Sequence, residues 1–518
     1  MADQTPLLST YSSETAPKKQ QSSAADHTIE SCIGPTGPRQ LLQALLVSAA
    51  WAFDAQQTFV SVFTDAEPNW HCTNATSSSP PCPSAPCSLP PGSWAWDQPK
   101  EASIVSDFGL QCSSPFLAGL PASAFFAGCL AGGLLLATLA DSRLGRKNML
   151  VLSCLTMSLA AALTALSPNL WAYSALRFVC GFGRATVGTC AIVLANETVG
   201  RRWRDRISIV GFFFFTLGFL SLPGMAYLGR GSSWRSLYLW TSVPSFVYSA
   251  AVYLLASESP RWLLVRGRRD EAVELLKRIA ASNGNDTVVA SSSFSALSTV
   301  DQEDWNVGTF SSMRILWEKK WALRRLTAVM VVGFGVGMVY YGMPLNVGNL
   351  GSDLYLSVAL NAVAELPSSL VIFFVIGRLR RRRSLLALTT ASGACSALCA
   401  VLAGAGGPQM AAELVSFSGA CTAFNVLLIY SIELFPTCVR NSAMSMVRQA
   451  LVLGGVFAPL LVAEGRRTVF LSFGVFGLVI GCCGLFAASL PETRGGTMSD
   501  TLEEEEHKDD DIDIGTSP

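Results

Sequence analysis

Long apolar segments recur along this chain, and shorter polar segments separate them. Each apolar segment is close to the roughly 20 residues that a helix needs to cross a lipid bilayer. Backbone groups inside a bilayer must bond within their own segment, so we expect these segments to be helices. We find them at residues 41–63, 116–140, 148–167, 170–193, 207–228, 235–256, 326–347, 353–377, 384–404, 410–431, 441–464 and 468–490. The pattern therefore predicts an all-α integral membrane protein with twelve transmembrane helices.

The composition of the chain fits this pattern and narrows its class. Half of the 518 residues are apolar, only 14% are charged, and basic and acidic residues balance. This composition argues against disorder and against a soluble globule, and it gives no support for a nucleic-acid partner. No phosphate-binding loop occurs, so we expect no nucleotide. The three histidines lie outside the predicted spans and no zinc-type cluster occurs, so we expect no cofactor, no metal and no enzyme activity.

One charged pattern occurs twice along the chain. Glu197 is followed seven positions later by Arg204, and Glu433 by Arg440, each time between two apolar segments. An acid at a membrane boundary is costly without a partner, and an arginine can supply a two-pronged one. Two copies in equivalent settings indicate a duplicated membrane unit.

The loop between the first two spans, residues 64–115, is typical of an oxidising compartment. It contains four cysteines and one glycosylation sequon, at Cys72, Cys82, Cys87, Cys112 and Asn74. An even set of cysteines beside a glycan acceptor is typical of a lumenal or extracellular loop. Four cysteines allow more than one pairing, and the sequence does not choose among them.

Basic residues predict the orientation of the chain in the membrane. They concentrate in alternate loops, and the loops of opposite parity carry few of them. By the positive-inside rule, we expect both termini in the cytoplasm. An acidic dileucine pattern, from Asp3 to Leu8, favours a vacuolar or endosomal membrane over the plasma membrane.

The same pattern divides the chain into five parts. We expect a disordered cytoplasmic tail, a six-helix bundle, a cytoplasmic connector with short helices, a second six-helix bundle and an acidic cytoplasmic tail. Their boundaries are residues 1–37, 38–256, 257–325, 326–490 and 491–518.

Several short motifs resemble those of one transporter superfamily. The stretch Asp141-Ser-Arg-Leu-Gly145-Arg146-Lys147 resembles the cytoplasmic signature of the major facilitator superfamily, with one extra residue between Asp and Gly. Glu258-Ser-Pro-Arg261 and Pro491-Glu-Thr-Arg494 are similar to the sequences that close the sixth and twelfth spans in that superfamily.

Three further stretches are similar to plant organic cation/carnitine transporters, which belong to the organic cation, anion and zwitterion branch. They are Phe53–Phe59, Gly337–Met343 and Thr437–Ala443. The resemblance implies two pseudo-symmetric six-helix bundles around a central site that opens alternately to either side. It also implies transport of a small organic cation or zwitterion, carnitine-like or polyamine-like, driven by the membrane potential or by a coupling proton.

The resemblance assigns a gating role to charged residues at the cytoplasmic ends of the spans. Their ion pairs would hold one conformation and break in the other. The expected gate residues are Glu197, Arg204, Glu433, Arg440, Asp141 and Arg146. Removing one partner should shift the conformational equilibrium, because a charge left without its counter-charge is costly.

The expected substrate pocket combines aromatic faces with a carboxylate, because cation–π attraction strengthens where water is excluded. Glu365 in the eighth span matches the position at which the resemblance places a substrate-facing acid; alternatively, a proton or a neighbouring arginine neutralises it. Asp54, in the first span, should face the bundle interior or a wet cavity, or else lie at the interface of a tilted helix. The other candidate binding residues are Tyr340, Tyr341, Phe212, Phe215, Asn425 and Arg448.

The eleventh span departs from the animal relatives of this branch. Those that take cations tend to carry Asp where this chain has Val452, and those that take anions or carnitine tend to carry Arg. Arg448 lies one turn earlier on the same face, so it can receive a substrate carboxylate or pair with an acid such as Glu365. If Glu365 receives an ammonium group and Arg448 a carboxylate, a zwitterion such as carnitine fits.

Two other functions share part of this evidence. Sugar transport is the first, because the repeated acid–arginine spacing and Pro491-Glu-Thr-Arg494 also occur in sugar transporters. A receptor or sensor that keeps the fold but transports nothing is the second. Uptake by the purified protein in liposomes distinguishes them.

Overall fold

The computed structural model describes most of the chain and all of the predicted spans except parts of two. The described residues are 29–30, 33–34, 36–73, 86–90, 92–136, 144–283, 316–375, 378, 380–494 and 506. Several predicted features lie outside them, namely the dileucine pattern, Asn74, Cys82 and Asp141.

Helices dominate the first half of the chain. The first span consists of three helical pieces joined at Ala49 and Val60; both residues keep right-handed helical dihedrals, so the pieces form one continuous rod. The helices of this half are α2 (Pro38–Ser48), α3 (Ala50–Phe59), α4 (Ser61–Thr64), α6 (Pro115–Leu135), α8 (Arg146–Thr164), α9 (Leu170–Arg184), α10 (Val187–Thr198), α11 (Arg201–Leu228) and α12 (Trp234–Leu255).

Six long helices lie in the described part of the second half. They are α18 (Lys320–Asn346), α19 (Leu354–Val375), α20 (Arg381–Val401), α21 (Gly407–Leu434), α22 (Thr437–Gly465) and α23 (Val469–Leu485). Within the part of the chain that the structure describes, nine helices, with α9 and α10 taken together, are long and apolar enough to cross a membrane. The first span, α12 and α19 complete the twelve predicted segments.

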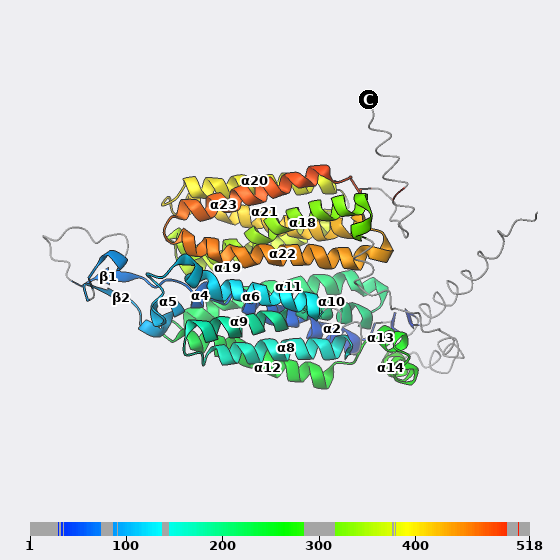
Figure 1. Cartoon of the computed structure of the whole chain (residues 1–518). Coiled ribbons are helices and arrows are strands. Elements are labelled where there is room, and N and C mark those ends of the chain that lie inside the picture. The colour runs from blue at the N-terminus through cyan, green and yellow to red at the C-terminus, as the bar shows by residue number, and fades with distance from the viewer. Residues whose placement is uncertain are drawn as a thin grey trace, which may run out of the picture.

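The helices form two bundles that lie side by side (Figure 1). The first-half helices pack mainly on one another, and so do α18 to α23. The bundles meet along α6 with α22 and along α11 with α19. Gly119 of α6 makes one of these contacts possible, because a Cβ there would lie 2.8 Å from the carbonyl oxygen of Pro459 on α22.

Apolar side chains also cover much of the outer surface of the bundles. Leu254, Val247 and Leu478, for example, are all more than half exposed. A surface of this kind is stable against lipid chains, because the helices satisfy their own backbone groups. The chain is therefore a multi-pass membrane protein.

The two ends of the molecule differ in character. At one end, which we call the disulfide end, lie β1 (Trp70–Cys72), β2 (Trp94–Trp96) and α5 (Ile104–Asp107). The strands pair antiparallel, with Trp70 opposite Trp96. Cys87 and Cys112 form a disulfide there, and Cys72 is disulfide-bonded as well.

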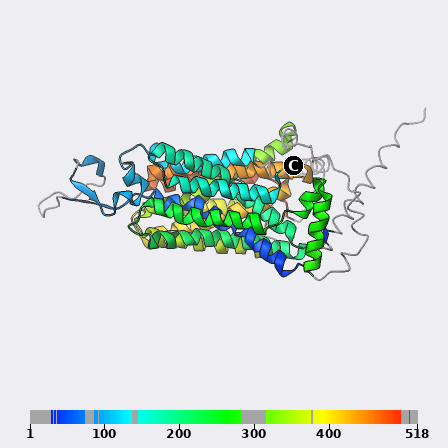
Figure 2. The same ribbon diagram turned by 90° about the horizontal axis from the view of Figure 1, so that it is seen from below.

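At the opposite end, which we call the charged end, the connector between the bundles forms two short helices. These are α13 (Pro260–Val265) and α14 (Arg269–Ser282), and both lie beside the first bundle (Figures 1 and 2). One face of α14 is buried, with Ala272, Leu276 and Ala280 on it.

Candidate substrate site and gates

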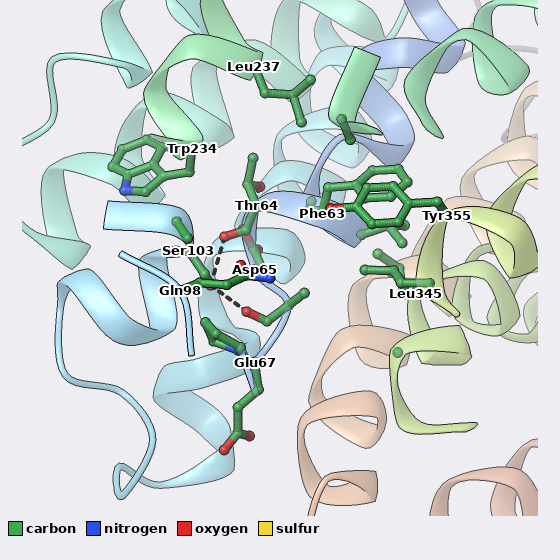
Figure 3. A pocket seen from close by; sticks show the side chains of 18 of the residues that line it. Phe63, Thr64, Asp65, Glu67, Gln98, Ser103, Trp234, Leu237, Leu345 and Tyr355 are labelled. Carbon is green, nitrogen blue, oxygen red and sulfur yellow. Dashed lines mark hydrogen bonds between the residues drawn. The ribbon is translucent and has the colours of Figure 1, made fainter. Parts of the chain in front are cut away.

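A cavity of about 1010 Å³ opens at the disulfide end, between the two bundles. Its polar lining includes four acids and two arginines: Asp65, Glu67, Asp97, Asp353, Arg230 and Arg466. Figure 3 shows Asp65 with Thr64 and Ser103 on one wall, and Phe63 beside Tyr355 on the other. Burial raises the pKa of Glu67, and the positive charge of Arg466 opposes this shift. The excess of acids makes this cavity attractive to cations.

Aromatic and charged contacts join the two bundles at this end. Tyr355 of α19 stacks on Phe63, with ring centroids 5.7 Å apart, and meets the edge of Tyr227 at the same distance. The guanidinium group of Arg230 lies 5.0 Å from the centre of the Tyr355 ring. Arg466 of the second bundle donates a hydrogen bond of 2.6 Å to the backbone carbonyl of Asp65 in the first. These contacts connect the two bundles within the lining of the cavity.

Glu365 lies deep in the second bundle with an aromatic partner. The hydroxyl group of Tyr340 donates a hydrogen bond of 2.6 Å to one carboxylate oxygen, and the other oxygen is buried without a partner. The Tyr340 ring packs on Phe424 and Phe417. Asn425, half-buried, follows Phe424 on α21. The structure thus places one predicted acid against one predicted aromatic wall.

Tyr341 points away from this acid, as expected for the neighbouring position on a helix. Its ring lies 4.7 Å from that of Phe126 on α6, so it lies where the two bundles meet. Arg448 of α22 interacts electrostatically with Tyr341. Among the described residues Arg448 forms no ion pair, and Glu365 is bonded to Tyr340 instead. The alternative in which Arg448 neutralises Glu365 is therefore not the arrangement in this structure.

Asp54 is fully committed to a partner in the first bundle. Arg184 of α9 donates to both of its carboxylate oxygens, at 2.6 and 3.2 Å. Their side chains keep only 12% and 4% of their surface exposed, so the pair is a largely desolvated, two-pronged ion pair. Asp54 does face the bundle interior, but Arg184 occupies the oxygens that a substrate cation would use.

The run of four phenylalanines on α11 divides between the interior and the surface. Phe212 and Phe215 both pack on Trp51 at 6.0 Å, and Phe215 also meets the edge of Phe59. Phe213, between them, is about half exposed. The two phenylalanines chosen from the sequence are therefore the inward pair.

The repeated acids at the charged end do not pair with the arginines seven positions later. Glu197 instead binds Arg146 at 2.7 Å, and Arg204 binds Glu30 at 3.3 Å. The expected pairs are wrong because α10 ends at Thr198 and a new helix begins at Arg201. That change of direction separates the side chains of Glu197 and Arg204, and Arg146, the first residue of α8, binds Glu197 instead.

The second bundle repeats this arrangement. Glu433 binds Arg381, the first residue of α20, at 3.0 Å, whereas Arg440 donates to the carbonyl of Phe435. Thr493 donates a further hydrogen bond of 2.6 Å to Glu433. The duplication predicted from the sequence is present, but the basic partner comes from a different segment.

A second acid completes each charged cluster by capping a helix. Glu258 accepts the backbone N–H groups of Arg146 and Lys147 at the start of α8, and Glu492 accepts that of Arg381 at the start of α20. Helix N-termini favour negative charge, because their first N–H groups lack partners within the helix. Burial raises the pKa of Glu258, and the N–H donors oppose that shift.

The sequence of residues 56–503 matches the family described as "Sugar (and other) transporter". The chain belongs to this family. It is 54% identical over 520 residues to organic cation/carnitine transporter 2 of Arabidopsis thaliana, a match that covers 98% of each chain. It is 32% identical over 428 residues to solute carrier family 22 member 3 of Rattus norvegicus, covering 82% of this chain and 75% of that protein. The resemblance to organic cation/carnitine transporters, predicted from the sequence, is therefore confirmed. The family and these relatives are transporters and not enzymes.

Solved structures support the fold. The inward-open conformation of the xylose transporter XylE from E. coli superimposes with a TM-score of 0.63 at 16% identity, covering 90% of this chain and 98% of that one. The all-α fold with twelve transmembrane helices, inferred from the apolar segments, is confirmed as the major facilitator fold.

Sequence reasoning missed several residues that build the site. The cavity acids lie in loops without a motif, and their convergence depends on the loop fold. Arg381 lies in a run of basic residues, so its pairing with Glu433 had no distinguishing signal. Glu413 of α21 stands alone within an apolar segment, and an isolated intramembrane acid is itself a signal.

Proposed function

We propose that this chain transports small organic cations or zwitterions across a membrane by alternating access. The observation that carries this proposal is Glu365, buried beside Tyr340 and Phe424 with one carboxylate oxygen unpaired. A cation with apolar groups can place its charge at that oxygen and its body against the rings. The names of its relatives, organic cation/carnitine transporters, support the same substrate class.

The proposal extends to zwitterions if Glu365 and Arg448 each bind one of the two charges of the substrate. Arg448 has no acidic partner among the described residues, so it is free to receive a substrate carboxylate. Glu365 would take the ammonium group of the same molecule. Asn425, Phe212 and Phe215 would line the path, whereas Asp54 with Arg184 would brace the first bundle.

Uptake by purified protein in liposomes tests this division. Carnitine is the zwitterion, and tetraethylammonium is the cation without a carboxylate. We expect Glu365→Gln to lose both activities and Arg448→Ala to lose carnitine uptake while retaining most tetraethylammonium uptake. Arg278→Ala, on the exposed side of α14, is the control and should resemble wild type.

Three outcomes would contradict parts of the proposal. Equal loss of both substrates in Arg448→Ala would refute the division of labour. Uptake of xylose or glucose, but of neither organic ion, would favour a sugar transporter, a possibility raised by the likeness to XylE. Binding without uptake by the wild type would favour a receptor.

We also propose that the charged end faces the cytoplasm, together with both termini. The basic residues Arg146 and Arg381 lie at that end, in agreement with the positive-inside rule. The disulfide end would then face the lumen of the vacuole or the outside of the cell, where Asn74 would carry a glycan. Glycosidase treatment of the expressed protein, with Asn74→Gln as control, tests this orientation.

A further inference from the structure

A second carboxylate is buried in the second bundle, away from the proposed substrate contact. Glu413 of α21 is completely inaccessible to solvent. Asn361 of α19 donates a hydrogen bond of 3.1 Å from its amide nitrogen to one oxygen of Glu413. The other oxygen of Glu413 and the amide oxygen of Asn361 are both buried without partners. Two unpaired acceptors therefore belong to two groups that already touch.

A single proton on Glu413 gives both of these unpaired oxygens a role in one hydrogen bond. An ionised carboxylate can only accept hydrogen bonds, so it leaves the amide oxygen of Asn361 unsatisfied. A neutral carboxylic acid offers one donor and one acceptor, which complement the acceptor and the donor of a primary amide. Buried polar groups without partners are costly, so the structure favours the neutral form of Glu413.

The surroundings of Glu413 supply no positive charge that would favour ionisation. Among the described residues, the titratable groups acting nearby are the thiols of Cys399 on α20 and Cys421 on α21. Glu365 on α19 also acts on Cys421, and Tyr340 of α18 binds Glu365. No described arginine or lysine acts on Glu413. A buried acid without a counter-charge holds its proton.

A polar stripe on α19 connects this acid to the cavity at the disulfide end. Asp353, Ser357, Asn361 and Glu365 follow at intervals of four residues, which places them on one face of the helix. Asp353 lines the cavity. The backbone oxygen of Ser357 accepts a hydrogen bond of 3.1 Å from Asn361, the residue that holds Glu413. Glu413 therefore joins the stripe midway between the cavity and Glu365.

We propose that Glu413 is a proton-binding site of the transport cycle and that it supplies Glu365 with the proton that displaces the bound cation. This inference rests on the proposed cation transport. A proton from water in the cavity neutralises Glu413, and its transfer to Glu365 leaves Glu413 ionised and Glu365 neutral. The neutral Glu365 then releases its organic cation, so a proton has replaced that cation at this carboxylate. The expected result is exchange of protons for organic cations.

Infrared spectroscopy tests the proton site without any substrate. A buried protonated carboxylic acid has a carbonyl band distinct from that of a carboxylate. We expect purified wild-type protein near neutral pH to show such a band and Glu413→Gln to lack part of it. Glu101→Gln, an exposed loop variant, should keep the wild-type spectrum. An unchanged spectrum in Glu413→Gln would overturn the proposal, whatever the transport assays give.

Transport in liposomes tests the coupling. We expect wild-type uptake of tetraethylammonium to accelerate when the liposome interior is acidic, and Glu413→Gln to lose this acceleration. The melting temperature of the purified Glu413→Gln protein serves as the folding control and should stay close to that of wild type, because the amide introduced by this substitution retains a donor and an acceptor for Asn361. Two results would overturn the coupling: a wild type insensitive to the pH gradient, or a Glu413→Gln protein that keeps full sensitivity. Absence of any uptake by the wild type would instead reject the proposed function.

Discussion

At the scale of single residues, the buried acids of this transporter differ in the group that faces them. Asp54 faces a guanidinium group, Glu365 a phenol and Glu413 an amide. The guanidinium stabilises the charge, whereas the amide leaves an acceptor that only a proton satisfies. Glu258 faces the backbone N–H groups of a helix start. Similar side chains thus acquire different chemistry from their immediate partners.

Glu258 gives a stability prediction with a definite sign. Its pKa in the folded protein is raised, so the folded state holds the proton more tightly than the unfolded state does. The stabilisation from this proton is complete below the ordinary glutamate pKa and is lost as the pH rises through the folded pKa. We therefore expect the melting temperature of wild type, relative to Glu258→Gln, to increase as the pH falls from neutral toward that ordinary value.

Thermal unfolding in detergent, followed by tryptophan fluorescence at several pH values, measures this difference. Glu101→Gln, in an exposed loop, is the matched control and should shift less. A difference between wild type and Glu258→Gln that shrinks as the pH falls would show that the sign is wrong.

At the scale of secondary structure, close contact between α6 and α22 depends on the absence of a side chain. The Cβ of any other residue at Gly119 would meet the backbone of Pro459, which belongs to the other bundle and cannot rotate away. Both residues line the cavity at the disulfide end. Added bulk at this point must therefore move the bundles apart or strain the helices.

Gly119→Ala should shift the molecule toward opening at the disulfide end. Overpacking of this kind costs about 1–3 kcal/mol, and separation of the bundles relieves it. Spin-label distances between the first and second bundles should lengthen at that end. Gly224→Ala on α11, where an added Cβ meets no atom within 4 Å, should leave the distances unchanged. Identical distances in Gly119→Ala and wild type would contradict this interpretation.

The positions of the helices could be predicted from the sequence much better than the ion-pair partners of individual side chains. Apolar length alone located α12 within one residue at each end, because bilayer thickness sets the length of a span. The pairs of Glu197 and Glu433 could not be predicted, because they depend on how a helix turns at its end and on which segment begins beside it. Three of the cavity acids, Asp65, Glu67 and Asp97, lie in the loop of residues 64–115, whose sequence offers no periodicity from which to predict its fold.

At the scale of the whole molecule, one arginine helps to hold the two bundles together at the disulfide end. Arg466 follows α22 and reaches the backbone of Asp65 at the end of the first span. Alternating access requires such contacts to break when this end opens. Arg466 is thus a candidate latch, with Tyr355 and its aromatic neighbours beside it.

Arg466→Ala should favour conformations that open at the disulfide end. A hydrogen bond to a charged group contributes about 1.5–3 kcal/mol, and its loss shifts a two-state equilibrium by roughly tenfold or more. Labelling of a cysteine introduced at Phe63 should become faster by a similar factor. Arg467→Ala, which removes the exposed neighbouring arginine, is the control. Equal labelling rates in the two variants would argue against the latch.

The paired clusters at the charged end have a consequence for the conditions in which the transporter works. Arg146 with Glu197 and Arg381 with Glu433 keep only about a tenth to a fifth of their side-chain surface in contact with water. Dissolved ions weaken attractions between charges that they can surround, and they reach sheltered pairs poorly. Changes in the ionic strength of the surrounding solution should therefore leave both clusters intact. The equilibrium between the conformations open to either side should then change little as well.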